Sequence, residues 1–144
     1  MNNEIYKNQY IKLCKWVKSN GFKVKESHKA LDRVEFSERI VHINSQYKYE
    51  NKLYTLLHEC GHLKTDKNIK TFLKYHPIYS TGQWDGRVIK SKAYKVCLVS
   101  EELKAWHDGL KLANKLGFKI NKKNYDKMMV DSVFTYIAWA GSFV

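Results

Sequence analysis

Several features that would direct a chain to a membrane or an oxidising compartment are missing from this sequence. No apolar run approaches the roughly 18–20 residues that a bilayer-spanning helix needs. The first residues, MNNEIYKNQY, lack the apolar segment of a signal peptide. The three cysteines, Cys14, Cys60 and Cys97, are odd in number and widely spaced, which argues against a disulfide framework. We therefore expect a cytoplasmic protein without a membrane partner.

Linker sequence is also missing. Pro77 is the one proline, and no stretch is rich in glycine, serine or proline. The chain has 144 residues, of which 44% are hydrophobic and 14% aromatic, enough to form one compact core. We expect residues 1–144 to form a single domain.

The chain has an excess of positive charge, with 26 Lys and Arg against 14 Asp and Glu, a net charge of +12. Such a balance favours association with nucleic acid, an anionic surface or an acidic protein. The lysines are spread along the chain with no tight cluster beyond pairs such as Lys122 and Lys123. Lysines on ordinary solvent-facing surfaces would give the same total, so nucleic acid is one partner to test.

Apolar periodicity predicts an α+β domain. An amphipathic helix is expected over residues 3–20, with Gly21 past its end, and a short antiparallel sheet over residues 22–44. Helices are also expected over residues 50–64, 91–116 and 121–139, with an irregular excursion over 66–92. In the last helix the residues assigned to the inner side are Tyr125, Met128, Met129, Val133, Tyr136, Ile137 and Ala140.

The segment LYTLLHECGHLKTD contains a metal-binding motif on the second predicted helix. His58 and His62 lie four residues apart, so both imidazoles project from one helical face and can reach one ion. Glu59 is rotated by about 100° from His58, which places its carboxylate beside the ion rather than on it. Catalytic zinc has three protein ligands and a water, and Glu59 is the natural base for that water. Two exposed histidines and a surface acid are the structural alternative.

Two histidines need a third ligand. The candidates are Asp66, His76, Asp85, Glu101, Glu102, His107 and Asp108. On the 91–116 helix, Glu102 falls in the middle of the apolar stripe, whereas Glu101 falls with Asp108 on the side assigned to solvent. A buried carboxylate is costly unless it is paired or bound to a metal, which favours Glu102. A salt bridge to a buried lysine, or a one-residue error in the helix phase that would favour Glu101, remains an alternative.

The sequence resembles the small gluzincin-type zinc metallopeptidases, which include minimal gluzincins and the ImmA/IrrE-like peptidases often encoded on phages. The resemblance covers residues 30–116 and depends on His58-Glu59-Cys60-Gly61-His62 and on the E-x-x-A sequence that begins at Glu102. It implies a zincin-like domain that binds one Zn²⁺ through His58, His62 and Glu102, with Glu59 as the general base. SprT-like proteases associate with DNA and share H-E-x-x-H, but they have a further histidine where this chain has Asp66.

The resemblance implies a zinc metalloendopeptidase that acts on an intracellular protein or peptide. Tyr79, Tyr94, His76 or His107 could stabilise the oxyanion, and the strand at 39–44 could hold the substrate as an added strand. One alternative is a non-enzymatic, zinc-stabilised basic module that binds DNA or a host protein. A second is zinc-dependent hydrolysis of a non-peptide amide, in a small molecule or in cell wall.

Overall fold

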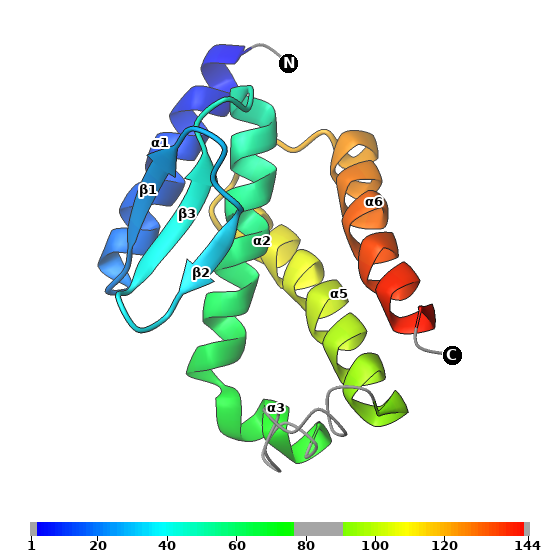
Figure 1. Cartoon of the computed structure of the whole chain (residues 1–144). Coiled ribbons are helices and arrows are strands. Elements are labelled where there is room, and N and C mark those ends of the chain that lie inside the picture. Colours follow the sequence, from blue (N-terminus) through cyan, green and yellow to red (C-terminus); the bar gives the residue numbers. More distant parts are fainter. Residues whose placement is uncertain (1–2, 77–90, 143–144) are drawn as a thin grey trace.

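The computed structural model describes residues 3–76 and 91–142, which form helices and a small sheet (Figure 1). The elements in chain order are α1 (Asn3–Ser19), β1 (Lys23–Ser27), β2 (Arg33–Glu35), β3 (Ile40–Asn44), α2 (Tyr49–Lys67), α3 (Ile69–Tyr75), α5 (Lys92–Lys115) and α6 (Lys122–Gly141). The predicted α+β class is confirmed.

The sheet is mixed, with β3 between β1 and β2. β2 pairs with β3 antiparallel, as predicted, but β1 pairs with β3 in parallel, so the prediction of an antiparallel sheet is wrong for β1. The connection between Ser27 and Arg33 is long enough that β2 does not pair with β1. β3 lies between them and pairs with both strands. The prediction that the strand at 39–44 is a free edge is wrong for the same reason. β2 is the edge strand nearer the site described below.

The core lies where α1, α2 and the sheet meet, and α5 and α6 follow on the other side of α2 (Figure 1). The stripe predicted for the first helix is buried in full, and so are the apolar positions of α2. The fully or almost fully buried hydrophobic residues of these elements are Tyr6, Tyr10, Leu13, Val17, Val41, Ile43, Leu53, Tyr54, Leu56, Leu57, Cys60 and Leu63. The left-handed backbone of Gly21, at φ +84°, ends α1 as predicted.

The region predicted to be irregular, residues 66–92, is partly helical. α2 continues to Lys67, and α3 follows it with Phe72 buried. Buried apolar contact around Phe72 supplies the packing that the weak periodicity of this stretch did not indicate. The turn residues Gly82 and Asp85 lie outside the described residues.

The last helix has a narrower buried face than predicted. Tyr125 and Val133 are buried and Tyr136 is half-buried, but Ile137 is 49% exposed, so the prediction for Ile137 is wrong. The reason is that α6 contacts the rest of the molecule mainly through α5. Within 3–76 and 91–142, no helix combines the length and apolarity needed to cross a bilayer.

Candidate metal centre

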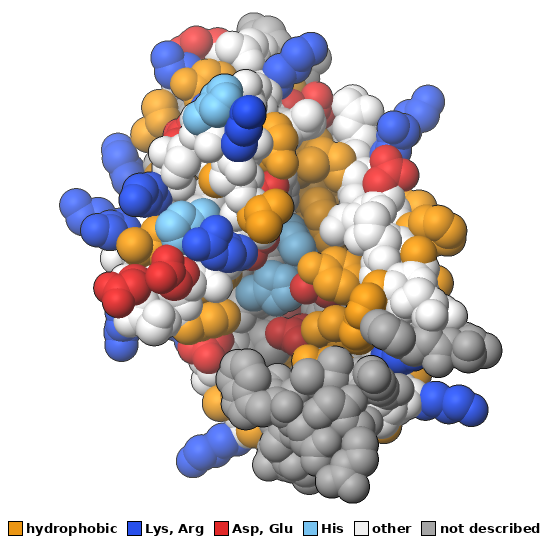
Figure 2. Space-filling model, in the orientation of Figure 1, with side chains coloured by type: hydrophobic (Ala, Val, Ile, Leu, Met, Phe, Trp, Pro, Cys, Tyr) orange, Lys and Arg blue, Asp and Glu red, His pale blue; other side chains and the backbone are white. Residues whose placement is uncertain are grey.

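A cavity of about 210 Å³ opens between α2, the edge strand β2, α5 and α6. Its lining residues are Asp32, Arg33, Val34, Phe36, His58, Glu59, His62, Glu102 and Tyr136. Figure 2 shows histidine and acidic side chains at the floor of this hollow, between the sheet and α6. The H-E-x-x-H motif therefore faces a solvent-connected cleft rather than the sealed core.

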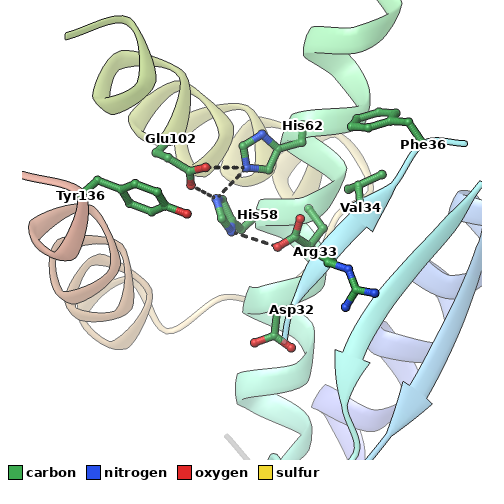
Figure 3. A pocket seen from close by; sticks show the side chains of 9 residues that line it. Asp32, Arg33, Val34, Phe36, His58, His62, Glu102 and Tyr136 are labelled. Carbon is green, nitrogen blue, oxygen red and sulfur yellow. Dashed lines mark hydrogen bonds and ion pairs between the residues drawn. The ribbon is translucent and has the colours of Figure 1, made fainter. Parts of the chain in front are cut away.

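Three side chains converge at the floor of the cleft (Figure 3). His58 Nε2 lies 2.9 Å from Glu102 Oε2, and His62 Nε2 lies 3.3 Å from Glu102 Oε1. The two histidine Nε2 atoms are 3.2 Å apart. α2 supplies the histidines from successive turns, and α5 supplies Glu102. Glu102 is 7% exposed, which confirms that it lies on the buried face of its helix.

These separations can be compared with those between neighbouring ligand atoms of a tetrahedral ion. Zinc–nitrogen and zinc–oxygen bonds of about 2.0–2.1 Å place tetrahedral ligand atoms about 3.3 Å apart. The two contacts of His62 agree with that spacing, and the contact of His58, which is made with the other carboxylate oxygen of Glu102, is a few tenths of an ångström shorter. His58, Glu59 and His62 also offer ligand atoms that all lie within 4.8 Å of one another, so this group could hold a metal ion.

Glu59 and Glu102 occupy different sides of the histidines. Glu59 Oε1 lies 3.5 Å from His58 Nδ1, the ring nitrogen on the opposite side from the one that meets Glu102. Glu59 is only 4% exposed, yet it lines the cleft. Glu102 thus lies on the Nε2 side of the His58 ring, and Glu59 lies on its Nδ1 side.

Other side chains hold the two imidazoles in place. The ring of His58 stacks on Trp106 of α5, with ring centroids 4.4 Å apart and an interplanar angle of 8°. His62 Nδ1 lies 3.6 Å from Glu101 Oε1, a contact that favours Nε2 as the atom turned toward the cleft. Glu101 thus contacts His62 through Nδ1, whereas Glu102 meets its Nε2 atom, and Glu101 does not line the cleft. Trp106 is four residues after Glu102, which puts both on the same face of α5.

The electrostatics of the site are those of a buried ion-pair cluster. Burial disfavours the charged form of His62, but Glu101 and Glu102 raise the pKa of this histidine to about 10. Burial likewise opposes ionisation of Glu102, but hydrogen bonds with His58 and His62 lower the pKa of this carboxyl to about 2. Burial raises the pKa of Glu59 despite the two histidines nearby. A raised pKa suits a carboxylate that must accept a proton near neutral pH.

The remaining sequence candidates lie away from the cluster. Asp66 is exposed at the end of α2, and His107 is exposed on α5. His76 lies 3.2 Å from Cys97 through its Nδ1 atom, and Tyr94 does not line the cleft. Tyr79 and Asp85 lie outside the described residues.

The predicted phase of this helix is wrong at Asp108, which was assigned to the solvent side but is only 5% exposed. Its carboxylate contacts Lys64 of α2 and Lys104 of α5. Lysine side chains from both helices fold over it, which buries a position that periodicity assigned to solvent. Asp108 of α5 therefore contacts α2 through Lys64, on a face of α2 that points away from the two histidines.

Tyr136 of α6 is a site residue that the sequence prediction missed. It was assigned to the inner side of the last helix as a core residue. In the structure it is half-buried, lines the cleft, and points its hydroxyl toward Glu102 and His58 (Figure 3). Burial, with the nearby Glu102 and Glu59 carboxylates, raises the pKa of Tyr136 to about 12, so its hydroxyl stays a proton donor at neutral pH. No pattern within α6 distinguishes it from a core tyrosine.

The cleft continues along α2 into a second, larger hollow of about 470 Å³. His58, Glu59 and Tyr136 line both hollows, and Leu31, Trp106 and Met128 give the second one an apolar lining. The metal centre is therefore bordered by a space large enough for an apolar side chain. Compared with protein-family models, curated proteins and solved structures, the chain matches none of them.

Proposed function

We propose that this protein is a zinc-dependent peptidase of the gluzincin type, in which His58, His62 and Glu102 hold one zinc ion. The convergence of these three side chains from two helices carries the proposal. Two imidazoles and one carboxylate are a donor set that catalytic zinc uses, and their spacing suits a tetrahedral ion with one open position. A zinc ion held there would lower the pKa of water to about 7 and polarise a carbonyl group.

Glu59 is the proposed general base. Its carboxylate lies beside His58, within the cleft, and is not needed as a ligand once Glu102 fills the third position. From there it takes a proton from the attacking water and passes it to the leaving amine. Burial raises its pKa, which makes this carboxylate a stronger base than an exposed glutamate.

Tyr136 is the proposed oxyanion donor. Its hydroxyl enters the cleft from α6 and points toward Glu102 and His58 (Figure 3). A neutral phenol can donate a hydrogen bond to the oxygen that becomes negative when water attacks a carbonyl. The role assigned from the sequence to Tyr79, Tyr94, His76 or His107 therefore passes to Tyr136 in this proposal.

The edge strand β2 is the proposed substrate-binding strand. Arg33 and Val34 of β2, and Phe36 after it, line the cleft beside the histidines. An extended peptide that adds to the free edge of β2 would pass over the metal centre, with its backbone paired to the strand. The adjoining apolar hollow could then hold one of its side chains.

Activity can be tested without knowledge of the natural substrate. The zinc-loaded wild-type protein and Glu59→Gln are each incubated with a denatured mixture of proteins, and new N-termini are identified by mass spectrometry. We expect new termini from the wild type alone, with stoichiometric zinc in both proteins. Glu59→Gln purified in the same way is the control for contaminating proteases.

Equal cleavage by the two proteins, or no cleavage by the zinc-loaded wild type, would contradict the proposal. A parallel incubation with muropeptides tests hydrolysis of non-peptide amides. Release of fragments there, but not from protein, would move the activity to that class. Zinc content alone, with no hydrolysis in either assay, would favour a zinc-stabilised binding module.

A further inference from the structure

A third hollow lies on the other side of α2 from the candidate metal centre. It has a volume of about 350 Å³ and lies between α1, α2 and α5. Its α2 residues, Cys60, Leu63, Lys64 and Lys67, are rotated roughly 140° to 240° around the helix from His58, at 100° per residue. This basic groove therefore shares no lining residue with the catalytic cleft and is accessible independently of it.

The groove is strongly positive at its rim. Lys64 and Lys67 line it from α2, and Lys111 and Lys115 line it from α5. Asp108 is the one acidic lining residue, so these charges sum to +3. The cleft at the metal centre differs in sign, because Asp32, Glu59 and Glu102 there face a single arginine. Part of the excess positive charge of the chain is thus gathered on one concave surface.

The lysines of the groove differ in their pairing. Lys64 Nζ lies 3.8 Å from Asp108, and Lys67 donates a hydrogen bond to Asn20. In the part of the chain that the structure describes, no carboxylate pairs with Lys111 or Lys115, and both are exposed. These two lysines lie one turn apart on α5, about 6 Å along the helix axis. Their two ammonium groups can therefore contact successive anionic groups of one extended ligand.

The interior of the groove is apolar and includes an aromatic ring. Trp16 of α1 is half-buried and lines the groove with Leu63 and Leu112. Asn20, one turn after Trp16, adds a side-chain amide at the rim. A planar group that enters the groove can therefore lie against an indole while its anionic substituents remain at the lysines.

From this combination we propose that the basic groove binds single-stranded nucleic acid, with a base against Trp16 and phosphates at Lys111 and Lys115. Repeated phosphates supply a row of negative charges, and every base offers a planar face for stacking. A membrane surface would use the lysines but offers no ring for a recess that contains an indole, and an acidic protein would need aromatic side chains spaced among its carboxylates, whereas every nucleotide carries both groups. The proposal does not depend on the peptidase activity.

The test uses full-length Glu59→Gln protein, so that a failure of the proposed hydrolysis cannot affect it. Fluorescence anisotropy measures binding of a labelled oligothymidylate of about 12 nucleotides, from about 50 to 200 mM salt. We expect Lys111→Ala with Lys115→Ala to weaken binding and to reduce the salt slope by about 0.7 for each phosphate that the removed lysines neutralise. Lys122→Ala with Lys123→Ala removes the same charge from the start of α6, away from the groove, and is the matched control.

The contribution of Trp16 is tested with two variants, because the indole also packs against the core. Trp16→Leu removes the stacking face and should weaken binding roughly tenfold, whereas Trp16→Phe should retain most of the affinity. Thermal unfolding verifies that both variants are folded. Equal affinity of the folded Trp16→Leu variant and the parent protein would overturn the assignment of the base to the groove.

Two other outcomes would also overturn the proposal. If the two lysine pairs lower oligonucleotide affinity equally, binding reflects net charge and not the groove. If the protein ignores the oligonucleotide but binds phosphatidylserine vesicles in a manner that depends on Lys111 and Lys115, the groove serves an anionic membrane instead.

Discussion

Gly61 on α2 lies directly against the backbone of Ala105 on α5. A Cβ atom at Gly61 would stand 2.0 Å from the carbonyl oxygen of Ala105, and one at Gly109 would stand 2.4 Å from the carbonyl oxygen of Leu57. Each helix thus contributes a glycine to the place where it meets the other. This close approach brings Glu102, one turn before Ala105, within reach of the two histidines.

A methyl group at Gly61 should force the two helices apart. We expect Gly61→Ala to lower the free energy of unfolding by about 3 kcal/mol, since overpacking against backbone outweighs the better helix propensity of alanine. It should also weaken zinc binding, because Glu102 moves away with α5. Chemical denaturation and zinc titration measure the two effects.

Gly141 provides the matched control for this substitution. It ends α6, and a Cβ atom there would meet nothing within 4 Å. Gly141→Ala should leave stability unchanged or raise it by up to about 1 kcal/mol. Similar destabilisation in the two variants would show that the close contact at Gly61 is not what the substitution disturbs.

The third ligand can be identified by comparing three carboxylates. Glu102→Ala should lose stoichiometric zinc, because its oxygens are the ones that meet both histidines. Glu101→Gln should weaken affinity by about tenfold, since Glu101 only orients His62. Asp66→Ala should retain full affinity because its side chain is exposed. Metal content after dialysis and competition with a chelator measure this order.

A different order would reassign the site. Stoichiometric zinc in Glu102→Ala together with its loss in Glu59→Gln would make Glu59 the third ligand. The group formed by His58, Glu59 and His62 allows this arrangement on distance alone. Zinc that is lost equally in all variants would point to unfolding, which circular dichroism detects.

Tyr136→Phe tests the proposed oxyanion donor. Loss of one such donor typically costs on the order of 10²–10³ in kcat, and we expect that loss with KM and zinc content unchanged. Tyr94→Phe is the matched control, because Tyr94 does not line the cleft. An equal loss in the two variants, or a change in KM alone, would remove Tyr136 from the chemistry.

Local periodicity was sufficient to predict which helical faces carry His58, His62 and Glu102. Four-residue spacing puts His58 and His62 on one side of α2, and the apolar stripe of α5 puts Glu102 on its buried side. The small residues Gly61 and Gly109 lie on the faces where these two helices meet. These features depend on one helix at a time, and the 3.6-residue repeat describes a single helix well.

The repeat within one helix or strand does not predict how the elements are placed relative to one another. The central position of β3 depends on where the chain crosses the sheet, and alternation within a strand does not specify its neighbours. Tyr136 and Asp108 were misassigned because their surroundings come from other helices. A tyrosine on an inner face looks the same in sequence whether its hydroxyl meets core or cleft.

Glu50 links the start of α2 to α6 and should make stability depend on pH. Its Oε2 atom accepts hydrogen bonds from the Tyr54 hydroxyl at 2.8 Å and from Asn124 at 3.0 Å. Burial alone would raise the pKa of Glu50, but these hydrogen bonds lower it below the usual value. Folding therefore favours the ionised carboxylate. Its contribution is present above the unfolded pKa and is lost as pH falls through the folded one.

Glu50→Gln should accordingly cost about 1 kcal/mol of unfolding free energy at pH 7, because charged hydrogen bonds are stronger than neutral ones. The difference from the wild type should shrink as pH falls from neutral toward about 3, below the usual pKa of a glutamate. Denaturant unfolding across this range measures it, with Glu38→Gln in the exposed turn between β2 and β3 as the control. A difference that stays constant with pH would mean that Glu50 acts through packing alone, since only an ionised carboxylate gives stability that acid removes.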